Sequence, residues 1–426
     1  MSRPSPLPTA PAPAPAARTG WVRAAATVLA ALVAMGVVAA LGLWAAGAAR
    51  LPDDAFPRVV AATVVAAVGG SMELSGDAGA LARTHAGVTV MPLSVTLTGA
   101  LVVAAGFLRP LRRRAPAGPW HLGGWAVQVA VLWSAALVGL AFAARQTFAV
   151  DLGNGVLDAL GGLFGLEPRV GFTTQVGLTV VFGLLWLAGV LLVALAAAGR
   201  APLPPRLLGF GASVRRGVRA MVALLLACVV VGVVVALVTA GVRGHAADTF
   251  ALVLLGLPNL TWFAFTVGLG ATWHGRVDGP FGLPVPHLLD EVLRTPDVST
   301  VNLLTLAEHD GRVWWLVVAD AVLLLGAAFL AAARSPAGTP LWRHAVRMAV
   351  ALVLTVLTVC LVGRISAHYG LSLLGIGDVG GVLSGEVLLR PRLWSALGLA
   401  ALWGLVTGGL GALPARSARA RRRSPS

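Results

Sequence analysis

The chain contains no lysine and has little charge of any kind. Only 12% of its 426 residues are charged, whereas 58% are hydrophobic and the mean hydropathy is +0.86. Ordinary soluble domains carry about 25% charged residues, so this composition excludes a soluble globular protein. The net charge of +15 comes from arginine alone. These arginines flank apolar runs, as expected where they orient membrane spans, and no nucleic-acid partner is predicted.

The residues that build metal and catalytic centres are also scarce. Cys228 and Cys360 both lie inside apolar runs, which excludes a disulfide framework and a cysteine metal site. No two of the eight histidines are spaced i, i+4, and no His-Glu-x-x-His motif occurs. We therefore predict no metal and no cofactor. The absence of a nucleophile–base arrangement also disfavours an enzyme.

Long apolar runs dominate the remaining sequence. A membrane-spanning helix needs about 20 apolar residues because its backbone groups must bond within the segment. We predict an all-α, polytopic transmembrane helix bundle with about eight spanning helices. The eight segments are Ala24–Ala48, Val88–Leu108, Trp125–Ala144, Thr173–Gly199, Ala220–Val242, Val313–Ala333, Ala345–Gly363 and Trp394–Leu413.

Two further apolar stretches are short or interrupted. Val59–Val68 is too short to cross a bilayer and ends in Gly69-Gly70, and Leu257-Pro258-Asn259 interrupts Thr249–Thr272. Proline removes a helix hydrogen bond, and asparagine in hydrocarbon needs a partner. We interpret both stretches as re-entrant elements that leave the membrane on the side they entered.

The charges separate into two sets under this topology. Segments on one side hold 20 of the 32 arginines and no acid, whereas loops on the other side hold 16 of the 17 acids. If Thr249–Thr272 crossed the membrane, every later arginine cluster would change sides, against the positive-inside bias. The sequence thus predicts a multi-pass protein of a bacterial cytoplasmic membrane with both termini in the cytoplasm. Four long outer loops carry the acids.

The two halves of the sequence resemble each other. Pro116-Ala117-Gly118 is echoed by Pro336-Ala337-Gly338, and Pro168-Arg169 by Pro391-Arg392, at offsets of about 220 residues. A parallel duplication with four helices in each half is predicted; chance similarity in an Ala/Gly/Leu-rich chain is the alternative. The resulting division is a disordered cytoplasmic tail (1–20), a first repeat (21–199), a second repeat (200–413) and an Arg-rich cytoplasmic tail (414–426).

A few polar residues are candidates for a site. Asp320 is the only ionisable residue deep in a predicted span, which makes it a functional candidate or a protonated side chain bonded to a neighbouring helix. Pro258 and Asn259 mark a discontinuous helix, which either builds a midplane site or is a kink capped by the asparagine. The outer re-entrant loop adds a glycine-rich candidate site or hinge. Its candidate residues are Gly69, Gly70, Glu73 and Asp77.

Several segments carry a resemblance to a known family: Val65–Ser71 with Gly76-Asp77, His85–Val88 with Met91–Ser94, Leu254–Asn259, Leu306–Trp314 and Leu371–Gly375. They resemble the streptophobe family, very hydrophobic membrane proteins of actinobacteria. The resemblance covers nearly the whole chain after the N-terminal tail, although the middle loop Val150–Leu166 is shorter than expected. It implies a membrane location and carries over no catalytic residue.

Two functions of different classes follow. The repeats, the re-entrant elements and Asp320 favour a transporter-like or lipid-handling protein, for which we expect a polar cavity lined by Asp320 and Asn259. The alternative is a structural or regulatory membrane component that binds a protein partner, or another copy of itself, through its large outer loops. The lipid bilayer is the one partner that both hypotheses require.

Overall fold

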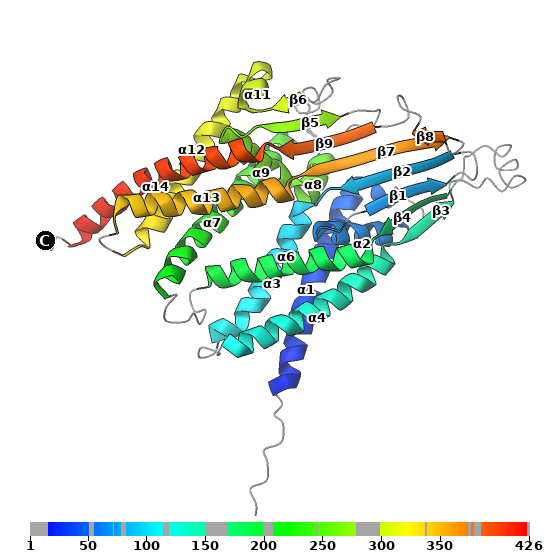
Figure 1. Cartoon of the computed structure of the whole chain (residues 1–426), viewed down its shortest axis with the longest axis horizontal. Coiled ribbons are helices and arrows are strands. Elements are labelled where there is room, and N and C mark those ends of the chain that lie inside the picture. The colour runs from blue at the N-terminus through cyan, green and yellow to red at the C-terminus, as the bar shows by residue number, and fades with distance from the viewer. Residues whose placement is uncertain are drawn as a thin grey trace, which may run out of the picture.

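The computed structural model shows a helical bundle with one β-sheet at its end (Figure 1). It describes residues 16–50, 55–70, 72–77, 82–113, 119–149, 169–198, 208–243, 246–277, 299–336, 339–373, 376–378 and 385–423.

Most predicted spans are single helices of the bundle. Among the described residues, seven helices are long and apolar enough to cross a membrane. They are α1 (Ala16–Ala45), α4 (Pro119–Ala143), α6 (Val176–Ala197), α7 (Leu208–Arg243), α12 (Trp314–Ala333), α13 (Leu341–Val362) and α14 (Leu393–Arg423). The eighth predicted span is α3 (Leu93–Arg113), whose apolar part, Leu93–Arg109, is shorter than the others. The predicted multi-pass helical bundle is therefore confirmed.

The two interrupted stretches are short helices. The first is α2 (Ala55–Ala67), which ends where Gly69 adopts a φ of 93°. The second is a pair, α8 (Ala246–Leu255) and α9 (Leu257–Gly268), bent by 77° at Gly256. Pro258 lies in the first turn of α9, where its missing N–H is tolerated, and it cannot continue α8.

The sequence analysis did not predict the sheet. Nine antiparallel strands form it, in the order β3-β4-β1-β2-β7-β9-β5-β6, with β8 paired to β7. The strands are β1 (Met72–Asp77), β2 (Ala82–Thr89), β3 (Gln146–Ala149), β4 (Arg169–Thr174), β5 (Trp273–Val277), β6 (Ser299–Val301), β7 (Ile365–Leu373), β8 (Ile376–Asp378) and β9 (Gly385–Pro391). All four predicted outer loops supply strands, so all four lie at the same end of the bundle. Both α2 and the α8–α9 pair lead directly into strands of this sheet, which is compatible with the predicted re-entrant path.

The two halves place their strands in the same order. In the first half the order is β3-β4-β1-β2, and in the second half it is β7-β9-β5-β6, with matching connections through the helices. The halves join where β2 pairs with β7 over eight residues, from Ala82↔Leu373 to Thr89↔Ser366. The second half ends the sheet differently: β6 has three residues and is followed by α11 (Leu303–His309), whereas β2 has eight.

Each half has its own apolar core. Met35, Val103 and Trp133 centre the first cluster, and Leu324 and Leu352 centre the second. Many apolar side chains outside these cores are exposed in stripes along the helices, as on α1, where every fourth residue from Leu29 to Val37 is over half exposed. Such stripes suit contact with lipid.

Glycines bring helices of the second half into close contact. A Cβ at Gly404 or Gly408 of α14 would collide with the backbone of α13. Small residues of this kind let two helix backbones approach within a membrane, where no hydrophobic force drives the helices together.

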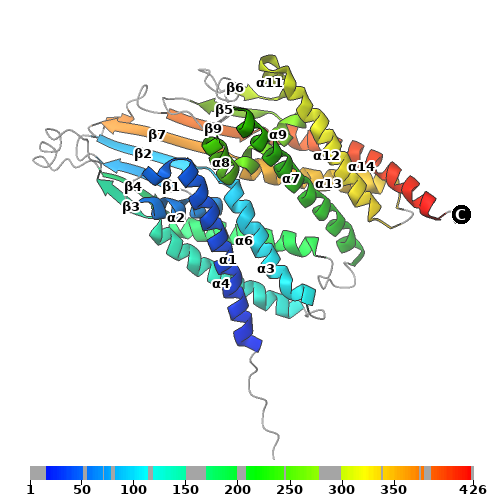
Figure 2. The same ribbon diagram turned by 180° about the vertical axis from the view of Figure 1, so that it is seen from behind.

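Two short elements remain to be described, and helical structure extends into both of the predicted tail ranges. Short 3-10 turns, η1 (Ala48–Arg50) and η3 (Gly311–Val313), follow α1 and precede α12. Helix α1 begins at Ala16 and α14 continues to Arg423, so both predicted tails are helical next to the bundle. Alanine and arginine favour helix there. The start of α1 and the end of α14 both lie away from the sheet, as the view from behind also shows (Figure 2).

Candidate functional site

Asp320 lies in the interior of the second half. It is 4% exposed, and its Oδ2 has no hydrogen-bond partner among the described residues. The oxygen lies directly against Gly268 at the end of α9, where a Cβ would collide with it. Only glycine at position 268 therefore admits the carboxyl group.

Asn259 joins the two halves and does not reach Asp320. Its Oδ1 accepts a hydrogen bond from the backbone N–H of Leu93 (3.0 Å), and its Nδ2 donates one to the carbonyl of Met91 (2.9 Å). Leu93 is the first residue of α3, so Asn259 satisfies one of the N–H groups that a helix start leaves unpaired. Nine residues of α9, about 13 Å, separate Asn259 from Gly268.

A second contact between the halves lies beside Asn259. The hydroxyl of Ser94 donates to the carbonyl of Val253 in the last turn of α8 (2.8 Å). The break before Pro258 leaves that carbonyl without its helical partner. Together, the two polar contacts dock the broken helix of the second half onto the start of α3.

The outer re-entrant candidates form a turn and a strand. Gly69 and Gly70 follow α2, and a Cβ at Gly70 would collide with Val65. Glu73 and Asp77 lie in β1, but their side chains are outside the described part of the structure. The structure thus shows a tight turn at this position and no gathering of described polar side chains around it.

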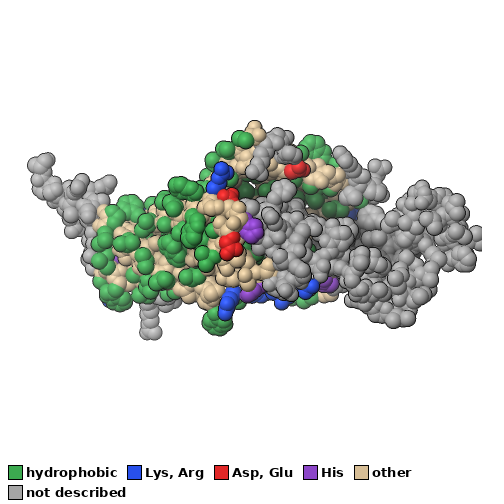
Figure 3. All heavy atoms as spheres, turned by 90° about the horizontal axis from the view of Figure 1, so that it is seen from above, with side chains coloured by type: hydrophobic (Ala, Val, Ile, Leu, Met, Phe, Trp, Pro, Cys, Tyr) green, Lys and Arg blue, Asp and Glu red, His purple; other side chains and the backbone are tan. Residues whose placement is uncertain are grey.

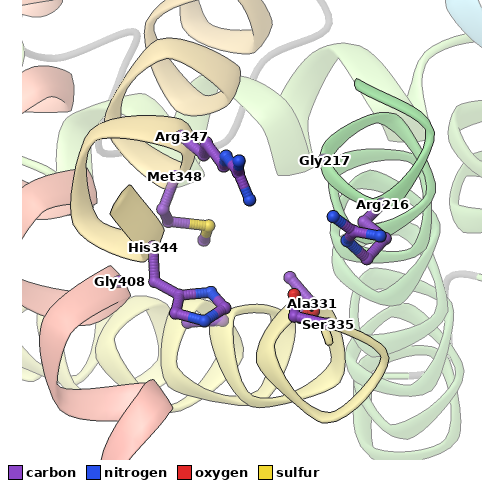
Figure 4. A pocket seen from close by; sticks show the side chains of 9 residues that line it. Arg216, Gly217, Ala331, Ser335, His344, Arg347, Met348 and Gly408 are labelled. Atoms are coloured by element: carbon purple, nitrogen blue, oxygen red, sulfur yellow. Dashed lines mark hydrogen bonds between the residues drawn. The ribbon is translucent and has the colours of Figure 1, made fainter. Parts of the chain in front are cut away.

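A small, open pocket of about 30 Å³ lies near the ends of the helices farthest from the sheet. Figure 4 shows Arg216 of α7 and Arg347 of α13 reaching into it from two sides, with His344 and Ser335 below them. The remaining lining residues are Gly217, Ala328, Ala331, Met348 and Gly408.

Two arginines share this pocket, and no carboxylate is among its described lining residues. Figure 4 shows both side chains at the same pocket, one from α7 and one from α13. Seen from above, carboxylate, histidine and arginine side chains lie together along one border of the hydrophobic helix surface (Figure 3). Like charges held together are costly in a partly buried place, so the pocket is suited to an anion.

Sequence reasoning missed Arg216, His344 and Arg347. It treated the two arginines as orientation signals, because each lies in an arginine cluster at a span end, and it gave His344 no role. One signal was present: Arg216 and Arg347 lie inside their helices, about two turns from each start. Comparisons with protein-family models, with curated proteins and with solved structures found no match for this chain.

Proposed function

We propose that this multi-pass membrane protein handles anionic lipid, binding a phosphate-bearing headgroup in the pocket of the second half. The observation that carries the proposal is the pair Arg216 and Arg347 in one pocket without a described carboxylate. Guanidinium groups bind phosphate oxygens in a bidentate way, and each charge-assisted hydrogen bond is worth about 1.5–3 kcal/mol.

The position of the pocket supports a lipid as the source of the phosphate. Its arginines lie within helices whose outer surfaces are apolar, at the end that carries the basic residues. If that end faces the cytoplasm, as the arginine distribution predicts, the pocket lies at the level of an inner leaflet rich in anionic lipid. His344 and the Ser335 region add polar groups around the headgroup.

The first half provides a natural comparison for Arg347. Its buried residues Val129, Trp133 and Leu137 on α4 match Met348, Leu352 and Val356 on α13. This match places Gln128 where the second half has Arg347.

The same comparison can be made for Arg216. Matching Val28 and Ala31 on α1 to Met221 and Leu224 on α7 places Arg23 where the second half has Arg216. At these two matched positions, therefore, the first half carries one positive charge and the second half carries two.

A transporter that rocks one half against the other fits less well. The β2–β7 pairing and the Asn259 contacts would have to break as the halves moved. The expected cavity lined jointly by Asp320 and Asn259 also requires residues that lie at opposite ends of α9. Lipid handling is therefore the better supported part of the expectation.

The experiment compares lipid retained by purified variants. Native mass spectrometry of the wild type should show bound phosphatidylglycerol, and Arg216→Gln with Arg347→Gln should lower its affinity more than tenfold. Arg23→Gln is the matched control and should leave binding unchanged. Retention by the double variant equal to wild type would refute the proposal. Competition by inorganic phosphate alone, without lipid retention, would assign the pocket to a free anion instead.

The sheet favours a second candidate, a structural or regulatory component. Nine strands from both halves form one surface at the end opposite the pocket. A protein partner, or another copy of this chain, that docks there should co-purify in fixed stoichiometry from gently solubilised membranes. A lone monomer after chemical cross-linking in intact membranes would count against this alternative.

A further inference from the structure

The two halves make the same turn after their short re-entrant helix. In the first half, the N–H groups of Gly69 and Gly70 donate to the carbonyls of Ala66 and Val65. In the second, Gly270 and Ala271 donate to Val267 and Thr266 in the same pattern. Gly69 and Gly270 also share a positive φ, of 93° and 94°. This match makes Ala67 of α2 the counterpart of Gly268 of α9.

A polar side chain from the following long helix meets this turn in each half. In the first half, the hydroxyl of Thr96 on α3 donates a hydrogen bond of 2.6 Å to the carbonyl of Ala67. In the second, Asp320 on α12 lies against Gly268. Thr96 and Asp320 are both buried, at 9% and 4% exposure. Asp320 therefore occupies the place of a hydrogen-bond donor.

We propose that Asp320 is a proton-binding site whose neutral carboxyl donates to the carbonyl of Gly268, tying α12 to α9. An ionised carboxylate at this position would have only acceptors, and it would face the carboxyl end of a helix, where the dipole is negative. A bare charge in a membrane interior is also costly. The neutral acid instead supplies the bond that Thr96 makes in the first half.

The charged and titratable groups around Asp320 do not supply a cation. Among the described side chains, α9 offers none between Leu257 and Gly268, and α14 offers none between Leu393 and Leu413. Helix α7, which packs against α12, contributes the buried thiol of Cys228, which carries no positive charge. Arg312 lies two turns away at the exposed outer end of α12. A proton is the remaining way to neutralise the carboxylate.

Proton loss would be transmitted beyond α12. Helix α9 holds the start of α3 through Asn259 at one end. At its other end it leads through Thr272 into β5 of the sheet. Once ionised, the Asp320 carboxylate and the Gly268 carbonyl would both be acceptors and would repel each other. Their separation would release the last turn of α9 and loosen its connection to the sheet.

The matched pair Asp320→Thr and Asp320→Val tests the bond, because the two side chains have the same shape and only threonine donates. Thr96→Val in the first half calibrates the loss of one such bond. We expect Asp320→Thr to melt near wild type in detergent, and Asp320→Val to melt lower by about the shift of Thr96→Val. Equal melting of the Thr and Val variants at position 320 would overturn the donor role.

Infrared spectroscopy tests the proton itself and does not depend on the stability of a variant. Wild type at neutral pH should show the carbonyl-stretching band of a protonated carboxyl, and Asp320→Asn should lack it. If both proteins show the same spectrum, Asp320 is ionised and the proposal fails. Neither measurement involves Arg216 or Arg347, so failure here leaves the lipid proposal untouched.

Discussion

Removal of the Asn259 side chain should measure how strongly the two halves hold each other. Asn259→Ala deletes the acceptor of the Leu93 N–H and the donor to the Met91 carbonyl. Leu93 is 2% exposed, so water cannot replace the lost acceptor. Two hydrogen bonds at about 1 kcal/mol each give an expected loss of about 2 kcal/mol, or roughly 30-fold in the unfolding equilibrium.

The assay is reversible unfolding in mixed micelles, followed as the fraction of denaturing detergent rises. Asn259→Asp keeps an acceptor for Leu93 and loses the donor to Met91, so its stability should lie between wild type and alanine. Thr261→Val on the same helix is the control, since its hydroxyl bonds only locally, to Pro258. A loss below about 0.5 kcal/mol in Asn259→Ala would show that the contact contributes little, as many hydrogen bonds in membranes do.

Three further predictions concern packing, the sheet and topology. Gly268→Ala should lower the melting temperature by several degrees, because its Cβ meets Asp320, whereas Gly36→Ala, with no atom within 4 Å of its Cβ, should not; equal shifts would contradict the close contact. Gly87→Ala should speed amide exchange in β2 and β7, because a Cβ at position 87 would collide with the ring of His368. Gly139→Ala is the control, since a Cβ at position 139 would meet nothing within 4 Å. Unchanged exchange in Gly87→Ala would disprove the close contact between Gly87 and His368. In a background without Cys228 and Cys360, Ser299→Cys should react with an impermeant thiol reagent in intact cells and Ser417→Cys only after lysis; the reverse pattern would invert the predicted topology.

The spanning helices were predictable because their signal is one-dimensional. Twenty consecutive apolar residues, as in α6 and α12, require no knowledge of the neighbours. The re-entrant pieces were also readable, since Gly69-Gly70 and Pro258 interrupt the apolar runs at the positions where the helices end. Boundaries shifted most at Ala16 and Arg423, where helices continue past the hydrophobic segment.

The sheet was not predictable in the same way. Strands such as β1, with Met72-Glu73-Leu74-Ser75-Gly76-Asp77, contain glycine and acids and lack β-branched residues. Their stability comes from pairing with strands far away in sequence, as β2 pairs with β7. The partners of buried polar side chains were equally unpredictable. Asn259 indicates a need for hydrogen bonds, but its partners at Met91 and Leu93 lie 168 and 166 residues away in the sequence.

The residues to which we assign a proposed role lie where the two halves differ, which makes the second half the proposed site of the chemistry. At matched positions, Gln128 and Thr96 of the first half give way to Arg347 and Asp320 of the second. At each of these positions the second half has an ionisable side chain, whereas the first half has a neutral side chain at the matched position. A neutral residue suffices for the fold at both positions, because the first half folds with it. The ionisable groups of Arg347 and Asp320 are therefore unnecessary for the architecture, and binding of an anion and of a proton are the roles that we propose for them.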